Sequence, residues 1–193
     1  GVNVVGNRFR VLGGDPVLIG NVENNTIGLF TQYNFTRGKW TNEAGLRSDF
    51  HNRYGNFLLP RLASFYQINA HWGARFGWGM GYKIPDALSP QIKEYEIEDI
   101  QPISSDARAE YSSGYNAEVN YKKKWDNEHS LFINHAFFLT SIYRPLVGKE
   151  DVNGKLSFAN AEKPVITRGF DTYMKLKLED WEIYAGITYT LAE

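Results

Sequence analysis

The stretch Trp72-Gly-Ala-Arg-Phe-Gly-Trp-Gly-Met-Gly-Tyr82 alternates between two kinds of residue. Its even positions carry Trp, Ala, Phe, Trp, Met and Tyr, whereas its odd positions carry four glycines and an arginine. Successive residues of a β-strand point to opposite faces, so this alternation separates an apolar face from a small or charged one. A helix would scatter the same residues around its circumference. The stretch therefore predicts a β-strand with one apolar face.

Seven further segments alternate in the same way or are apolar throughout. In the last of them, Trp181, Ile183 and Ala185 lie on one side, with Glu182 and Tyr184 opposite. One segment is apolar on both faces, so its pattern does not fix its register. Together with 72–82, these segments predict about eight strands of an all-β, antiparallel, up-and-down sheet. The seven segments are 26–35, 41–51, 57–68, 115–122, 131–143 (the doubly apolar one), 165–178 and 181–191.

The predicted connections alternate in length, and their short members contain the Gly, Asn and Asp residues that suit hairpin turns. In an up-and-down sheet every second connection lies on the same side, so the short turns share one rim and the long loops the other. This asymmetry is typical of outer-membrane barrels. The short turns are expected near 36–39, 69–70, 126–128 and 179–180, and the longer connections at roughly 52–56, 83–112 and 144–164.

Aromatic residues mark both ends of the predicted strands. Tryptophan and tyrosine favour the membrane–water interface, where an apolar ring can carry a polar tip. The ten steps from Trp72 to Tyr82, at about 3.3 Å each and tilted by about 45°, project to roughly 23 Å. That length is close to the roughly 25 Å apolar band of a transmembrane β-barrel, which is the predicted fold. The expected interface residues are Trp40, Trp72, Trp125 and Trp181 beside the short turns, and Tyr82, Tyr115, Tyr143 and Tyr189 toward the other ends.

Composition excludes several other classes of protein. The 21 Lys and Arg residues balance 22 Asp and Glu residues, which gives no basis for nucleic-acid binding. No stretch approaches the roughly 20 consecutive apolar residues of a membrane-spanning helix. The chain has no cysteine, which excludes disulfides and thiolate metal sites.

The sequence predicts no enzyme, metal site or cofactor. None of the four histidines stands at metal-ligand spacing from another histidine. The adjacent pair His129 and Ser130 suggests a hydrolase at first sight, but neighbours in a strand point to opposite faces and cannot act as base and nucleophile. Gly77-Trp-Gly-Met-Gly81 does not have nucleotide-loop spacing.

Two groups of charged residues leave alternatives open. The face of the predicted sheet opposite the apolar one carries Arg47, Arg61, Arg75 and Glu118, which fit either a polar barrel interior with a plug or a merely water-facing row. The connection 83–112 is rich in acids, which fit either a cation or simple solvation. These acids are Glu94, Glu96, Glu98, Asp99, Asp106 and Glu110.

Alternating strands with aromatic ends also occur in soluble sandwiches and lipocalin-like barrels. Eight strands suffice to close a small barrel around an apolar ligand. In that alternative, the apolar face of 72–82 points inward around a cavity.

The order of several short motifs resembles the barrel domain of TonB-dependent receptors. Phe57–Tyr66, followed by Gly73–Pro85, resembles the mid-barrel hairpin of that family, and Glu43-Ala-Gly-Leu-Arg47 its preceding strand. Asn160–Asp171 resembles a downstream segment of the family that begins with Asn and ends with Arg-Gly-Phe-Glu, with Asp171 in place of the usual Glu. The hairpin that follows and closes on 185–190 is similar to the family's as well. The residues that match are Pro60, Arg61, Leu62, Arg75, Gly79, Gly81, Tyr82, Lys83, Pro85, Arg168, Gly169 and Phe170.

The resemblance implies a barrel of about 22 strands, of which residues 1–193 supply a part of about eight. It also implies residence in the outer membrane and energy-dependent uptake of a metal chelate, vitamin or glycan, without catalytic residues. The implied partners are outer-membrane lipid, the rest of the barrel, the plug domain and, through that plug, TonB. Because Gly1–Arg10 is unlike a signal peptide and 189–193 ends directly after a strand, we expect the chain to be a fragment without plug, TonB box or closing strand.

Overall fold

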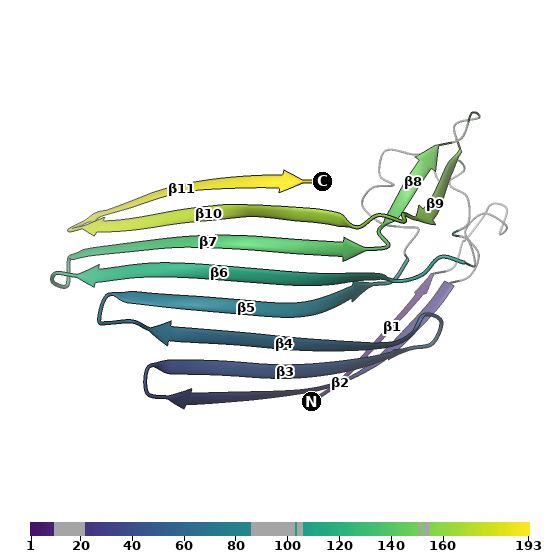
Figure 1. Ribbon diagram of the computed structural model, residues 1–193, viewed down its shortest axis with the longest axis horizontal. Helices are drawn as coiled ribbons and strands as arrows, with labels where there is room; N and C mark the ends of the chain where they lie inside the picture. The colour runs from purple at the N-terminus through teal and green to yellow at the C-terminus, as the bar shows by residue number, and fades with distance from the viewer. Residues whose placement is uncertain (10–21, 86–102, 104–105, 151, 153–154) are drawn as a thin grey trace.

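The computed structural model describes residues 1–9, 22–85, 103, 106–150, 152 and 155–193. Within them the chain forms one nine-stranded antiparallel sheet, in which the strands follow chain order, and a separate two-stranded hairpin (Figure 1). Within the described ranges no helix is long and apolar enough to cross a membrane. The predicted all-β, up-and-down antiparallel architecture is confirmed. The strands are β1 (Val2–Phe9), β2 (Val22–Arg37), β3 (Trp40–His51), β4 (Gly55–Gln67), β5 (Trp72–Lys83), β6 (Glu110–Lys124), β7 (His129–Tyr143), β8 (Leu146–Glu150), β9 (Leu156–Asn160), β10 (Val165–Leu178) and β11 (Trp181–Ala192).

All eight predicted strands are present, as β2 to β7, β10 and β11. Three further strands were not predicted. In β1, the alternation that starts at Val2 and Val4 stops at Gly6 and Asn7, so its pattern is too short to recognise. The hairpin of β8 and β9 lies inside the predicted connection 144–164, and each of its strands has only five residues.

Four short turns lie together at one end of the sheet, as predicted (Figure 1). They consist of residues 38–39, 68–71, 125–128 and 179–180. The other end carries the connections 84–109 and 144–164. Part of the former lies outside the described residues, and with it four of the six predicted acids, Glu94, Glu96, Glu98 and Asp99. One expectation for this end is wrong: the connection between β3 and β4 is a three-residue turn, 52–54. Gly55 follows it with a φ of 88°, which glycine adopts without strain and which allows the chain to reverse there.

Strand register divides the side chains between two faces, because residues paired across antiparallel strands share a face. One row links Leu62, Trp78, Tyr115 and Leu139 across β4 to β7. We call the face with this row the apolar face, and the opposite one, with Arg61 and Arg75, the polar face. The register of 131–143, left open by the sequence, is fixed by β6 and β10 on its two sides.

The nine-stranded sheet is open. Strands β1 and β11 lie at opposite edges, and each pairs with a single neighbour, β2 and β10 respectively. A small closed barrel would instead pair its first and last strands. Most large apolar side chains of the apolar face are exposed in this chain, with Trp181 at 73% and Ile187 at 62%. The small-barrel alternative, in which that face surrounds a cavity, therefore does not describe this structure.

Candidate functional site on the polar face

Among the described residues, the polar face carries four ion pairs, three with arginine and one between Lys175 of β10 and Glu182 of β11, whose Nζ and Oε1 lie 3.0 Å apart. Arg61 of β4 places Nε 3.2 Å from Oε1 of Glu43 on β3, and Arg75 of β5 places Nε 3.3 Å from Oε1 of Glu118 on β6. Arg47 places Nε 2.7 Å from Oδ1 of Asp49, two residues along β3. A charge that leaves bulk water is tolerated when a partner of opposite sign is in contact with it. The polar face is therefore suited to an enclosed, polar environment.

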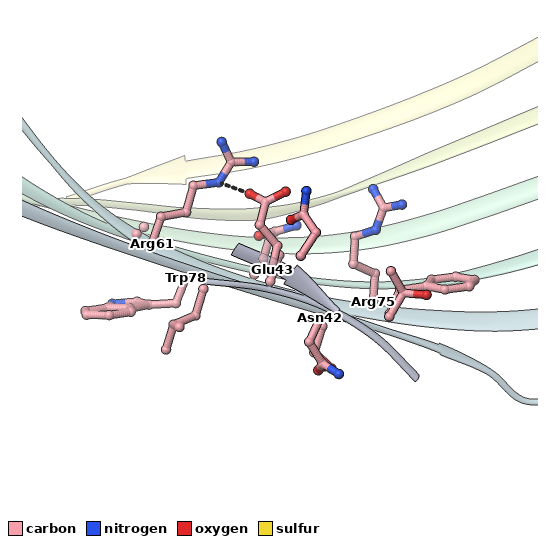
Figure 2. Close-up of a pocket in the computed structure, with 15 residues that line it drawn as sticks. Asn42, Glu43, Arg61, Arg75 and Trp78 are labelled. Atoms are coloured by element: carbon pink, nitrogen blue, oxygen red, sulfur yellow. Dashed lines mark hydrogen bonds and ion pairs between the residues drawn. The ribbon is translucent and has the colours of Figure 1, made fainter. Parts of the chain in front are cut away.

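A groove of about 550 Å³ lies between the ion pairs of Arg61 and Arg75. Figure 2 shows Arg61, Glu43 and Arg75 projecting from one side of the ribbons, and Trp78 and Asn42 from the other. The floor of the groove is low because Gly77 and Gly79 carry no side chains. A Cβ on Gly79 would meet nothing closer than 3.7 Å, so no contact within the described residues demands a glycine there. The groove is consistent with close packing of another polypeptide or ligand on this face.

Most of the aromatics predicted for a membrane interface lie on the apolar face or in a short turn. Trp40 packs on Tyr66 and Trp72 on Tyr121 on the apolar face beside the short turns, with ring centroids 4.5 and 4.8 Å apart. Trp125 lies in a turn, with the Lys123 ammonium 5.4 Å from its ring centroid. On the apolar face, Trp181, Tyr115, Tyr143 and Tyr189 all keep exposed rings.

Tyr82 departs from its predicted place on the apolar face. Its ring stacks on Phe57 at a centroid distance of 3.8 Å, and its hydroxyl donates a 2.9 Å hydrogen bond to Oδ2 of Asp49. Phe57 and Asp49 are paired residues of β4 and β3, and both are 1% exposed. The pairing of β4 with β5 ends at Arg61 and Gly79. Pro60, the residue of β4 that comes before Arg61, has no N–H to donate. The end of β5 separates from β4 there, while it stays paired with β6 as far as Lys83, and Tyr82 lies over Phe57.

At the outer end of the polar face, this stack of Tyr82 and Phe57 extends to two further strand ends. Tyr111 of β6 lies 5.5 Å from Phe57, between ring centroids, and the guanidinium of Arg144 lies 5.2 Å from the centre of Tyr111. Pro85 is buried just after β5. The sequence pattern did not predict this cluster, because at the end of β5 the period-two alternation no longer predicts the side on which the Tyr82 ring lies.

Polar groups on the apolar face are hydrogen-bonded to one another. Ser64 Oγ donates to Asn42 Oδ1 at 2.8 Å, and Trp78 Nε1 donates to Ser113 Oγ at 3.1 Å. His135 Nδ1 lies 2.7 Å from Thr172 Oγ1. Each pair joins neighbouring strands, so it could not be predicted from the sequence without the register of those strands. Pairing removes most of the cost of placing polar groups in an apolar medium.

The motif residues of β10 have local structural roles. A Cβ on Gly169 would lie 2.0 Å from the backbone oxygen of Tyr189, so no larger residue fits there. Phe170 stacks on Tyr189 at 5.7 Å on the apolar face. Arg168, on the same face, places Nη2 2.9 Å from a carboxylate oxygen of Glu193.

No group of three or more metal-ligating side chains occurs among the described residues. Ser130 lies on the polar face, where it pairs with Lys124 and Lys177, and His129 lies on the other face. The His129 ring contacts Asp126 at 2.9 Å rather than Ser130.

The comparisons with known proteins agree with this geometry. A family model described as "TonB dependent receptor-like, beta-barrel" matches residues 3–193. Among solved structures, the chain is similar to the siderophore receptor PirA from Pseudomonas aeruginosa, with a TM-score of 0.74 and 17% identity over 92% of this chain and 34% of that one. It is also similar to the FrpB iron transporter from Neisseria meningitidis, with a TM-score of 0.70 and 16% identity over 91% and 27%.

A third similar structure is a mutant of the ferric enterobactin receptor PfeA from Pseudomonas aeruginosa, with a TM-score of 0.68 and 17% identity over 93% and 29%. The chain thus spans about a third or less of the length of each of these three proteins. No curated protein matches the chain. The family match over nearly all residues, together with the up-and-down sheet, shows that the chain belongs to the TonB-dependent receptor-like β-barrels.

Proposed function

We propose that this chain forms part of the barrel wall of an outer-membrane receptor that takes up a scarce nutrient with energy delivered through TonB. The observation that carries the proposal is the division of one sheet into an apolar face with paired polar groups and a polar face with paired charges. A wall between lipid and an aqueous interior needs this division.

The apolar face is proposed to contact lipid. Its exposed aromatic and aliphatic side chains run across all nine strands, whereas a soluble monomer rarely exposes a continuous apolar patch larger than a few hundred Å². The tryptophans of the short turns would then lie at the periplasmic interface, and Tyr115, Tyr143 and Tyr189 nearer the outer one. The rest of the barrel would cover the open edges at β1 and β11.

The polar face is proposed to line the interior and to pack against the plug domain, which in turn would contact TonB. The groove beside Arg61 and Arg75 supports this assignment, because it is open at Gly79, where a Cβ would meet nothing closer than 3.7 Å. The proposed role is transport rather than catalysis, in keeping with the position of His129 and Ser130 on opposite faces of the sheet.

The proposed substrate is a metal chelate, with a vitamin or glycan as the other candidates. The three similar structures are named as siderophore, iron and ferric enterobactin proteins, which makes a ferric chelate the first substrate to test. Uptake of radioactive ferric chelates should occur in cells with the full-length receptor and intact TonB, and should stop when TonB is removed. Uptake that persists without TonB would overturn the proposed energy source.

The orientation of the wall can be tested by fluorescence quenching with brominated lipid. Single-tryptophan variants of the full-length receptor that keep Trp72, Trp78 or Trp181 should all be quenched, because all three side chains lie on the apolar face. The matched control keeps no native tryptophan and carries Phe138→Trp on the polar face, and it should not be quenched. Equal quenching of the control, or none at the three native positions, would contradict the assignment.

A further inference from the structure

Asn160, the last residue of β9, has a side chain that hydrogen-bonds only to backbone among its observed partners. Its Oδ1 accepts a 2.7 Å hydrogen bond from the N–H of Arg108. Its Nδ2 donates to the carbonyl oxygen of Arg108 at 3.0 Å and to that of Arg144 at 2.7 Å. The carboxamide thus bonds both the N–H and the carbonyl group of Arg108, as the backbone of a paired strand residue would. At the same time it bonds the carbonyl group of a second backbone segment.

The two segments held by Asn160 belong to different connections at the outer rim. Arg108 precedes β6, and Arg144 directly follows β7. Arg144 has a φ of 55°, in the left-handed region that a residue with a side chain adopts only when its surroundings hold it there. The bond from Asn160 to its carbonyl is one such restraint.

Two further contacts join the same two connections. Oε1 of Glu110 accepts a 2.8 Å hydrogen bond from the N–H of Leu146. Leu156 and Phe158 of β9, only 5% and 6% exposed, form a small core against which Ile103 and Leu146 pack. The hairpin of β8 and β9, itself part of the connection 144–164, is therefore anchored on Ile103, Arg108 and Glu110, with Asn160 at the point where the two segments meet.

We infer that Asn160 is a positioning residue that joins the roots of these two outer connections at Arg108 and Arg144, so that the two roots move as one unit. This inference rests on the proposed function only in placing these connections at the outer mouth of the receptor. Arg144 carries an exposed guanidinium over Tyr111, and its direction depends on the backbone that Asn160 holds. An asparagine is required because its side chain supplies one acceptor and two donors at this reach, whereas a carboxylate would face two carbonyl oxygens.

Hydrogen exchange in the full-length receptor, without ligand, tests the inference. Asn160→Asp should accelerate amide exchange around Arg108 and around Arg144 together, by roughly tenfold, because the carbonyl groups of both residues lose their hydrogen bond from the side chain, while the carboxylate can still accept from the N–H of Arg108. Exchange in β2 to β5 should stay unchanged. The matched control is Asn127→Asp in a short turn at the opposite rim, where the side-chain oxygen accepts only from Lys124 among its observed bonds. Acceleration at one root alone, or at neither, would overturn the inference.

The pH profile separates positioning from a general loss of structure. Below pH about 4 the carboxyl of the Asn160→Asp variant becomes protonated and can donate to one of the two carbonyl groups, so part of the protection should return. A variant that is merely misfolded would show no such recovery. Should Asn160→Asp fail to assemble in the membrane, Asn160→Ala removes all three bonds of the side chain without adding charge, and it must loosen both roots. Because the measurement needs no substrate, a failure of uptake leaves its result interpretable.

Discussion

His135 is a polar residue on the face that we propose to meet lipid. Its ring lies edge-on against Phe137 at 4.5 Å and near Phe170 at 5.6 Å, and its Nδ1 contacts only Thr172 among the observed bonds. A ring nitrogen without a partner in an apolar medium costs free energy, because no water replaces the lost bond. The pair is therefore expected to act as a unit rather than as two independent side chains.

The first prediction follows from this pairing. Thr172→Val should lower the free energy of unfolding of the full-length receptor in lipid by about 1–3 kcal/mol, since it leaves His135 unsatisfied. Thr167→Val, on the polar face of the same strand, is the control and should have little effect. The double change His135→Phe and Thr172→Val should recover most of the loss. Urea titration followed by tryptophan fluorescence measures all of these, and a double variant no better than Thr172→Val would contradict the idea.

Tyr82 gives the second prediction. Tyr82→Phe keeps the stack on Phe57 but loses the hydrogen bond to Asp49, so it should cost about 1–1.5 kcal/mol of unfolding free energy. Tyr82→Ala also removes the buried ring contact and should cost more, about 3 kcal/mol or above. If both variants were neutral in the same urea titration, the Tyr82 ring would instead lie on the apolar face, as its position in the alternation suggested.

At the scale of the strand, the sequence predicted the strands that are long enough to show a period-two alternation. Strands β2 to β7, β10 and β11 each have enough alternation, or enough apolar length, to be recognised without their neighbours. The strands of the β8–β9 hairpin are too short for a periodic signal, and the turn at 52–54 has no marker before Gly55. Tyr82 was misplaced because Pro60, on another strand, ends the pairing that the alternation assumed.

The turn between β6 and β7 leads to the third prediction. Asp126 Oδ1 accepts from the N–H of Glu128 at 2.8 Å and of His129 at 2.7 Å, and its carboxylate contacts the His129 ring. These bonds favour the charged form, the backbone bond from Glu128 most, so the pKa of Asp126 lies below its usual value. A depressed carboxyl pKa stabilises the turn above the unfolded value of about 4, and that contribution is lost as the pH falls through the folded value.

Amide proton shifts of Glu128 and His129 in micelles should therefore titrate together, with a midpoint below the usual carboxyl value of about 4. Asp126→Asn should abolish the titration while keeping a weaker acceptor in place. A midpoint at or above the usual value would show that the turn does not hold the charged form.

At the scale of the whole molecule, the sequence predicted the faces but not the pairs across them. Arg47, Arg61, Arg75 and Glu118 were predicted to share the face opposite the apolar one, either as a barrel interior or as a water-facing row, and all four lie on the polar face. The partner of Arg61, Glu43, and the bond between His135 and Thr172 depend on register. Register is set by the sum of many cross-strand contacts and by turn geometry, which no single strand reveals.

The open sheet leads to the last prediction. Among the residues that the structure describes, strands β1 and β11 each have one side without a pairing strand, and none of these residues covers the apolar face between them. Unpaired edges are templates for pairing with another chain. Residues 1–193 expressed alone and refolded in detergent should therefore give strand-rich assemblies whose size rises with protein concentration, whereas the full-length receptor should stay monomeric. Light scattering coupled to size-exclusion chromatography distinguishes the two. A monodisperse monomer of the isolated chain would mean that β1 and β11 can meet and close a small barrel, which would restore the alternative that the strand order now argues against.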